Sequence, residues 1–201
     1  MRNIESLQLR NPNHQAGMLR ARQLKAILAG LLATLVLTAC SGYERRTTGT
    51  VLNDQALERE VISNIHSNPA FGENDHIKVE VHEGVVLLAG ETISEENKLL
   101  ATTLAEQPRL TQRVVNDLKI GRRAGFGGKL DNSWLSTKVN AILVKENPLA
   151  GNDASRIKVI SSQNTVYLMG LVTREEGERV AEVVRNIGGV EKVVKIFDYT
   201  D

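Results

Sequence analysis

The only cysteine of the chain, Cys40, ends an apolar run over residues 26–39. The basic residues just upstream of that run are Arg20, Arg22 and Lys25. A lone thiol cannot form an intrachain disulfide, which leaves it open to another covalent modification. A basic segment, a short apolar segment and a small residue before a cut are the parts of a secretory signal peptide. The sequence therefore predicts a signal peptide over residues 1–39, removed to leave Cys40 as the first residue.

The four residues 37–40, Leu-Thr-Ala-Cys, resemble the lipobox of bacterial lipoproteins. That resemblance implies a thioether between Cys40 and diacylglycerol, and acylation of the new N-terminus. An Asp after the cysteine would resemble an inner-membrane retention signal, but Ser41 stands there. We therefore expect a lipid-anchored protein at the periplasmic face of the outer membrane. The alternative is a buried structural cysteine within a membrane-anchoring segment, although the run is shorter than the ~20 residues a spanning helix needs.

The N-terminus itself leaves two alternatives. A start at Met1 implies an unusually long segment before the apolar run, whereas a start at Met18 gives a signal peptide of ordinary length.

A second set of residues suited to chemistry at a membrane lies in the C-terminal half. Trp134, Lys138 and Lys145 recur at helical spacing, beside a stripe formed by Leu135, Val139 and Ile142. An indole lies well at headgroup depth, and lysines near an anionic surface contribute about 1 kcal/mol each. The alternative is that Trp134 covers the hydrophobic core and the lysines are ordinary solvated charges.

Composition argues against nucleic acid as a partner. Removal of residues 1–39 changes the formal net charge from +1 to −3, because five basic residues and one acid are lost. Nucleic-acid binding needs a clustered basic footprint. The remaining charges are dispersed, so we expect no nucleic-acid partner.

No combination of residues predicts catalysis, a cofactor or a metal site. His66, His76 and His82 have neither a second cysteine nor a carboxylate cluster near them in the sequence. Two acid pairs, at residues 95–96 and 175–176, fall at the start of predicted helices, where acids favour the positive helix end. We expect a binding protein with no catalytic residues, no metal and no cofactor.

The sequence that contains the helices and strands expected to position these residues occurs in two similar copies. Residues 54–120 and 131–199 share one pattern at a spacing of 78 to 80. Asn68-Pro69 matches Asn147-Pro148, and the Ile-Lys-Val at 77–79 matches that at 157–159. So many ordered matches indicate duplication and two modules.

Each copy reads helix, strand, strand, helix, strand. In copy one, Leu57, Val61 and Ile65 mark a helix capped by Asn53 or Asp54, and Glu83-Gly84 predicts a tight turn. Copy two is predicted as a helix over 133–146, strands over 157–161 and 165–172, a helix over 174–187 and a strand over 190–198. Each copy is thus an α+β module with two helices on one face of a three-stranded sheet. Gly90 and Gly170 match between copies and indicate close helix-on-strand approach or a bulge.

The two copies resemble the BON domain family of bacterial outer-membrane and nodulation proteins. In copy two the resemblance lies in Val166-x-Leu168-x-Gly170-x-Val172, Ala181 and Gly189-Val190-x-x-Val193. Copy one has Val86-x-Leu88-x-Gly90 but carries Pro108-Arg109-Leu110 in place of the Gly-Val pair. The resemblance implies two tandem BON modules, each a mixed three-stranded sheet on two helices in the order α-β-β-α-β. The predicted boundaries are a tether over 40–53, module one over 54–120, a Gly-rich linker over 121–130 and module two over 131–201.

The resemblance also implies the absence of enzymatic activity and the binding of phospholipid membranes. Dual-BON lipoproteins bind anionic phospholipid through the first helix of the second module, which carries a Trp near its start, and Trp134 stands in that place. Copy one has Ala56 and Glu60 where copy two has Trp134 and Lys138. We therefore expect only module two to bind lipid and the protein to support envelope integrity. The alternative is an assembly or chaperone factor for outer-membrane protein machinery, with module one as its protein-binding part.

Overall fold

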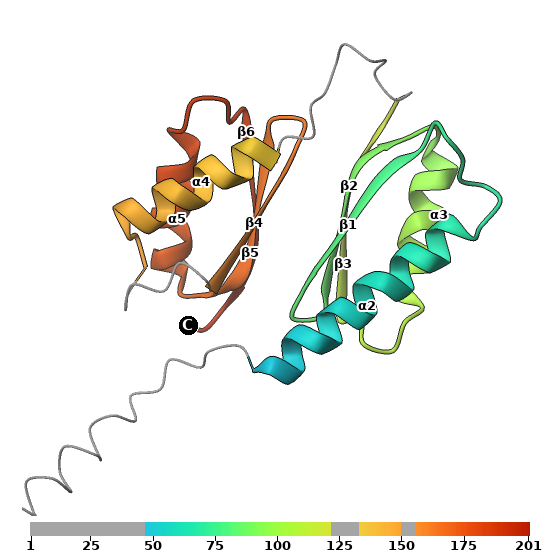
Figure 1. Ribbon diagram of the computed structural model, residues 1–201, viewed down its shortest axis with the longest axis horizontal. Helices are drawn as coiled ribbons and strands as arrows, with labels where there is room; N and C mark the ends of the chain where they lie inside the picture. The colour runs from blue at the N-terminus through green and yellow to red at the C-terminus, as the bar shows by residue number, and fades with distance from the viewer. Residues whose placement is uncertain (1–46, 122–132, 150–155) are drawn as a thin grey trace, which may run out of the picture. The chain divides into compact units, whose positions relative to one another are not determined.

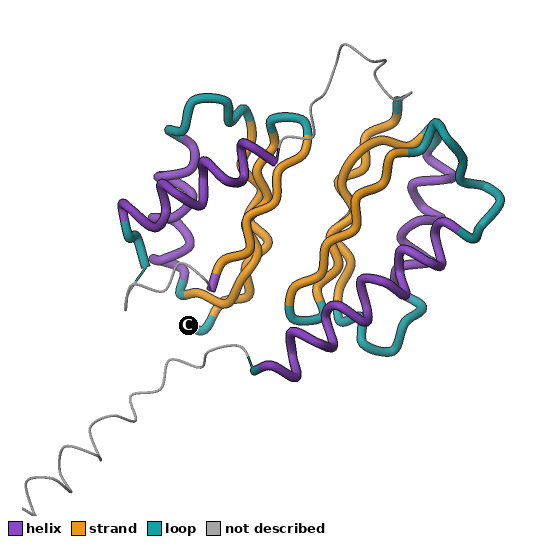
Figure 2. The backbone as a smooth tube through the Cα atoms, viewed as in Figure 1, coloured by secondary structure: helices purple, strands orange, loops and turns teal. Residues whose placement is uncertain are grey.

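The computed structural model describes residues 47–121, 133–149 and 156–201. Within them the chain forms two α+β modules, each with two helices on one side of a three-stranded sheet (Figures 1 and 2). The order helix, strand, strand, helix, strand is the one that the sequence predicts. The signal peptide, Cys40, the start of the tether and most of the linker lie outside the described residues.

Module one begins with α2 (Thr48–His66) and continues with β1 (His76–His82) and β2 (Val85–Thr92), followed by α3 (Glu95–Glu106) and β3 (Arg113–Ile120). Strand β2 is central, antiparallel to β1 and parallel to β3. The sheet is therefore mixed, as expected.

Module two repeats this topology. Helix α4 (Ser133–Glu146) precedes β4 (Ile157–Ser162) and β5 (Thr165–Val172), and α5 (Arg174–Arg185) precedes β6 (Lys192–Tyr199). Strand β5 is central, antiparallel to β4 and parallel to β6. The predicted helix over 133–146 and strand over 165–172 are confirmed. The predicted bounds of β4 and α5 differ by one and two residues at their C-terminal ends, and those of β6 differ by two residues at the start and one at the end.

The core of each module lies between its helices and its sheet. In module one, Leu57, Val61 and Ile65 of α2 pack against Val86 and Leu88 of β2. The same arrangement in module two places Leu135, Val139 and Leu143 of α4 against Val166 and Leu168 of β5. Alternate residues of each central strand fill this layer because successive side chains of a strand point to opposite faces.

The opposite face of each sheet is also buried, in one cluster that contains residues of both modules. Leu87 and Ala89 of β2 share it with Tyr167 and Met169 of β5. The Tyr167 hydroxyl donates a hydrogen bond of 2.8 Å to Asp117, and Lys158 pairs with Glu80 at 2.7 Å. Residues 45–201 accordingly form one compact unit.

The first helix begins earlier than the sequence indicates. The cap expected at Asn53 or Asp54 is wrong: Thr47 caps the helix, and its hydroxyl accepts from the Thr50 amide at 3.1 Å. The tether expected over 40–53 is therefore helical from Thr48 onward. Asp54 is buried inside the helix, where its carboxylate has a different partner described below.

Gly90 and Gly170 are required by a close approach, but of a strand and not of a helix. A Cβ on Gly90 would lie 2.0 Å from the carbonyl oxygen of His76, and one on Gly170 would lie 2.3 Å from that of Arg156. Gly90 pairs with Ile77, the second residue of β1, and Gly170 pairs with Ile157, the first residue of β4. No other residue type fits this contact without a backbone shift.

Candidate functional site

Helix α4 positions the residues that the sequence singles out in module two. Leu135, Val139 and Leu143 are buried and attach the helix to the sheet. The sequence named Ile142 as the third core residue, but Ile142 is only partly buried and Leu143 occupies that place. A helix face held by three buried side chains presents its remaining residues in fixed directions.

Trp134 is half exposed at the start of this helix, with 48% of its surface accessible. The buried part of the indole lies against the turn between α5 and β6. A Cβ on Gly189 would be only 2.8 Å from Cη2 of Trp134. The indole is therefore partly packed against this turn and partly open to solvent.

Lys138 lies one turn further along the helix and reaches the same turn. Its Nζ donates a hydrogen bond of 2.7 Å to the carbonyl oxygen of Gly188. The same Nζ is 5.8 Å from the centre of the Trp134 ring, within the range of a cation–π interaction. Trp134 and Lys138 are thus brought together, as their spacing predicts.

Lys145 lies at the other end of α4 and is exposed. Its Nζ is 3.5 Å from the carboxylate of Glu146, the adjacent residue. An exposed pair of this kind contributes little stability, so the ammonium group is held only weakly.

Val144 is a surface residue that the sequence reasoning missed. It is 69% exposed, more than any other large apolar residue of the described chain. It precedes Lys145 on the outer side of α4. The signal that would have found it is its departure from the core spacing of Leu135, Val139 and Leu143.

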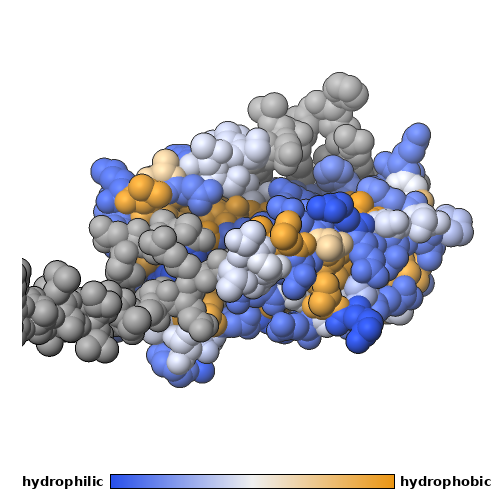
Figure 3. Space-filling view, turned by 60° about the horizontal axis from the view of Figure 1, so that its bottom comes forward, coloured by the Kyte–Doolittle hydropathy of each residue, from blue (hydrophilic) through white to orange (hydrophobic). Residues whose placement is uncertain are grey.

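Figure 3 shows one face of the molecule, where apolar residues lie in small groups between hydrophilic ones. Scattered apolar residues are normal on a protein surface. Val144 differs because it shares one short helix with an exposed indole and an exposed ammonium group.

The matching helix of module one has the opposite chemistry. Ala56 and Glu60 of α2 are exposed where α4 carries Trp134 and Lys138. The same backbone therefore presents a small residue and a negative charge.

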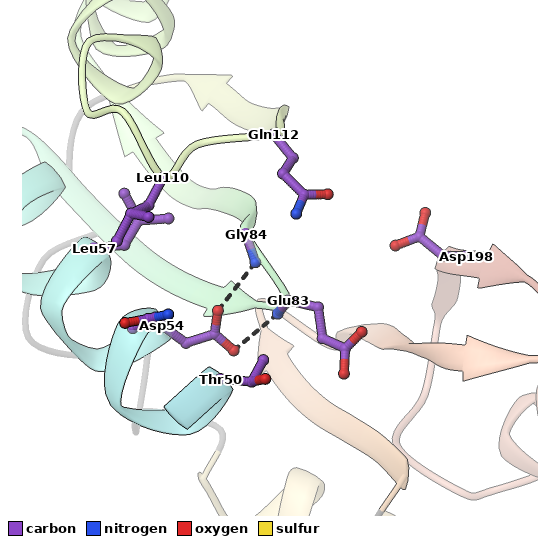
Figure 4. A pocket seen from close by; sticks show the side chains of 9 residues that line it. Thr50, Asp54, Leu57, Glu83, Gly84, Leu110, Gln112 and Asp198 are labelled. Atoms are coloured by element: carbon purple, nitrogen blue, oxygen red, sulfur yellow. Dashed lines mark hydrogen bonds between the residues drawn. The ribbon is translucent and has the colours of Figure 1, made fainter. Parts of the chain in front are cut away.

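A hollow of about 370 Å³ opens beside the start of α2, between the β1–β2 turn and the loop before β3 (Figure 4). Asp54 points to that turn, and its carboxylate accepts hydrogen bonds from the amides of Glu83 at 2.8 Å and Gly84 at 3.0 Å. Both turn residues have positive φ, 51° and 75°, and their amides need a nearby acceptor. Asp54 thus fixes the predicted Glu83-Gly84 turn.

The two acid pairs at the starts of α3 and α5 are structural. Glu95 and Glu96 lie in the first turn of α3, next to the capping residue Ser94. Glu176 closes a capping box with Thr173 and forms a buried ion pair of 2.7 Å with Arg156. The interpretation of these acids as helix-end residues is confirmed.

Two further features of the described residues bear on function. Among them, no group of three or more His, Cys, Asp or Glu side chains is arranged to hold a metal ion. None of the described helices has the length and apolar character needed to cross a bilayer. The apolar run over 26–39 lies outside the described residues.

A known domain family and known proteins are similar to this chain. Residues 53–122 and 131–201 match the BON domain. The chain is 29% identical over 178 residues to the outer membrane lipoprotein DolP of Haemophilus influenzae, covering 89% of this chain and 91% of that protein. It is also 29% identical over 154 residues to the 21 kDa hemolysin of Actinobacillus pleuropneumoniae, covering 77% and 78% of the two chains.

Among solved structures, the C-terminal domain of CdsD, a structural protein of the type III secretion system of Chlamydia trachomatis, is similar over 74% of this chain and 67% of that one. The sequence identity is 18% and the TM-score is 0.28. These values are too low to bear on function.

The two matched segments cover more than half of the chain and coincide with the two α+β modules. The similarity to DolP over most of both chains supports an outer-membrane lipoprotein built from two such domains. The chain belongs to the BON domain family and is a DolP-like protein with two BON domains.

Proposed function

We propose that this protein is lipid-anchored at the periplasmic face of the outer membrane and binds anionic phospholipid through helix α4 of module two. The role is one of binding and not of catalysis. Trp134, Lys138 and Lys145 form the proposed lipid-binding site, and Val144 extends its apolar surface. A protein with an acylated Cys40 and a lipid-binding helix would hold the membrane at two points, which is firmer than either point alone.

The observation that carries this proposal is the half-exposed indole at the start of a rigid helix. Burying an exposed indole at headgroup depth removes apolar area from water while its N–H stays hydrated. Val144 adds apolar area, and the exposed ammonium of Lys145 is attracted to an anionic surface. The chemistry of α4 is thus that of an interfacial helix.

Flotation with vesicles tests the lipid site. The chain from Ser41 to Asp201, which lacks the acylated residue, is mixed with phosphatidylcholine vesicles that do or do not contain phosphatidylglycerol. We expect flotation only with the anionic lipid, weakened by salt because the lysines act through a screened field. Trp134→Ala and Lys145→Glu should each reduce it.

Matched controls lie in module one. Leu99 is an exposed apolar residue of α3, and Lys119 is an exposed lysine of β3. Leu99→Ala and Lys119→Glu should leave flotation unchanged. Normal flotation of a folded Trp134→Ala protein would remove α4 from the proposal.

The anchor is tested separately in cells. Cys40→Ala should shift the protein from the membrane fraction to the soluble fraction, or leave it uncleaved. Unchanged, fully processed protein in the outer membrane would contradict lipidation at this residue.

A further inference from the structure

The turn between α5 and β6 forms a seat for the indole of Trp134. Its two glycines lie far from α4 in sequence, yet Gly189 lies against the Trp134 ring and Gly188 lies against the Lys138 ammonium group. Gly189 has φ of 104°, in the region that favours glycine, and an added Cβ there would collide with the ring at 2.8 Å. The absence of a side chain at this position is therefore what allows the indole to lie where it does.

Lys138 of α4 contacts both the turn and the Trp134 ring. Its ammonium group has two engagements, the hydrogen bond of 2.7 Å to the Gly188 carbonyl and the position 5.8 Å from the Trp134 ring. Both engagements point toward the turn. These two contacts hold the ammonium group of Lys138 beside the turn, whereas the ammonium group of Lys145 pairs with its exposed neighbour Glu146.

Module one lacks every part of this arrangement. Ala56 takes the place of Trp134 and Glu60 that of Lys138, and Arg109-Leu110 takes the place of Gly188-Gly189. The indole, the lysine and the glycine differ together between two copies of one fold. In module two these three residues lie together, because the ring contacts Gly189 and the Lys138 ammonium group lies near the ring.

We propose that Gly189 and Lys138 are positioning residues for Trp134, and that Lys138 acts on lipid binding through the indole and not as a direct headgroup ligand. The proposal rests on the proposed function, since it assigns roles within the same lipid site. Lys145 is then the lysine of α4 that meets the anionic surface.

A double-mutant cycle tests the role of Lys138. Affinity for phosphatidylglycerol-containing vesicles is measured for the starting chain, Trp134→Ala, Lys138→Met and the double variant. Met keeps the aliphatic stem against the ring and removes only the ammonium group. Lys138→Met should weaken binding about two- to fivefold, the factor that a surface cation–π contact supplies, and should add nothing once Trp134 is replaced.

Lys145→Met is the matched control in the same cycle. Its effect should be equal with and without Trp134, because it acts on the lipid directly. Additive effects of Lys138→Met and Trp134→Ala would overturn the positioning role while leaving lipid binding by α4 intact. Absence of binding by the starting chain would instead contradict the proposed function.

Fluorescence tests the seat without any lipid. The chain has one tryptophan, so its emission reports on Trp134 alone. Gly189→Ala should shift the emission to longer wavelength, because the ring is displaced toward water. Gly188→Ala should not, since its Cβ would meet only Lys138 Nζ at 3.7 Å, an ordinary contact.

Thermal melts on the same variants separate displacement from unfolding. If Gly189→Ala does not fold, Lys138→Met, an exposed change outside the core, is expected to give a smaller shift in the same direction. Unshifted emission in both folded variants would overturn the proposal.

Discussion

The two modules use different chemistry for one connection of the fold, which lies at the start of the first strand and is called the joint. In each, the residue just before the first strand is tied to the segment that runs from the end of the second strand into the second helix. Asp75 does this in module one with an array of hydrogen bonds, accepting from the Thr92 hydroxyl at 2.6 Å and from the Ile93 amide at 3.2 Å. Arg156 does it in module two with a buried ion pair to Glu176 at 2.7 Å.

The comparison shows which features of the duplicated fold are interchangeable. The sheet order, the registers and the glycines at positions 90 and 170 are the same in both modules because the backbone requires them. The joint needs only some polar connection, so its residues have diverged. The outer faces of α2 and α4 lie outside the core between helices and sheet and differ in chemistry, so a function specific to one module can arise there.

Breaking the joint of module two should have the largest effect. Arg156→Met leaves Glu176 buried beside an apolar side chain, and we expect the free energy of unfolding to fall by about 3–5 kcal/mol. The control in module one is His76→Met, next to the joint residue Asp75, because the His76 carbonyl faces Gly90 as the Arg156 carbonyl faces Gly170 and the His76 side chain is exposed. It should cost little. Urea denaturation of both variants measures the difference, and equal losses would show that the ion pair between Arg156 and Glu176 does not stabilise module two.

The shared glycines should respond alike. Gly90→Ala and Gly170→Ala each force a Cβ against a strand carbonyl, at 2.0 and 2.3 Å, and we expect a loss of about 3 kcal/mol in either module. Gly121→Ala, where an added Cβ meets nothing within 4 Å, is the control. A tolerated substitution in only one module would mean that the two sheets are not equivalent at this point.

The joint of module one should be sensitive to acid. Burial acts to raise the pKa of the Asp75 carboxyl, but hydrogen bonds from Thr92, Gly72, Ile93 and Asn97 outweigh it, and the pKa lies below its ordinary value of 3.8. The unfolded carboxyl takes up a proton first as pH falls. The stabilisation by Asp75 is therefore complete above pH 3.8 and is lost as pH falls through the folded pKa.

Asp75→Asn should cost about 1–2 kcal/mol at neutral pH. The difference from the starting protein should shrink as pH is lowered below 3.8. Urea titrations at successive pH values measure it. A difference that stays constant with pH would show that the charge of Asp75 does not contribute.

The smallest effect is expected from transferring the surface of α4 to module one. Ala56→Trp with Glu60→Lys, introduced into the Trp134→Ala chain, should give no measurable gain in flotation, because Arg109-Leu110 offers no seat for the indole. Recovery of binding would show that helix spacing alone makes the site and that the glycine turn is not needed.

Much of the fold was predictable because each element carries its own periodic signal. The helical stripe of Leu57, Val61 and Ile65 and the alternation in β1 are local patterns, and the repeat checks each assignment against a second copy. The start of α2 was not predictable from Asn53 or Asp54. Both are good capping residues, but the acceptor strength of Asp54 is used by a turn thirty residues away.

The candidate site divides in the same way. Spacing along α4 brought Trp134 and Lys138 together and separated them from the core stripe. It assigned Ile142 to the core in place of Leu143 and passed over Val144, since the exact direction of the stripe depends on how the helix packs on the sheet.

The sequence by itself determined the two modules, their strand order through the family resemblance, the turn at Glu83-Gly84 and the helix that carries the tryptophan. These follow from local spacing, because each involves residues a few positions apart. Only the tertiary structure showed that Gly189 seats Trp134, that the carbonyl of Gly188 holds Lys138, and that Tyr167 and Met169 are buried on the second face of the sheet. Those contacts join residues far apart in the chain, and no local pattern records which distant surface a side chain will meet.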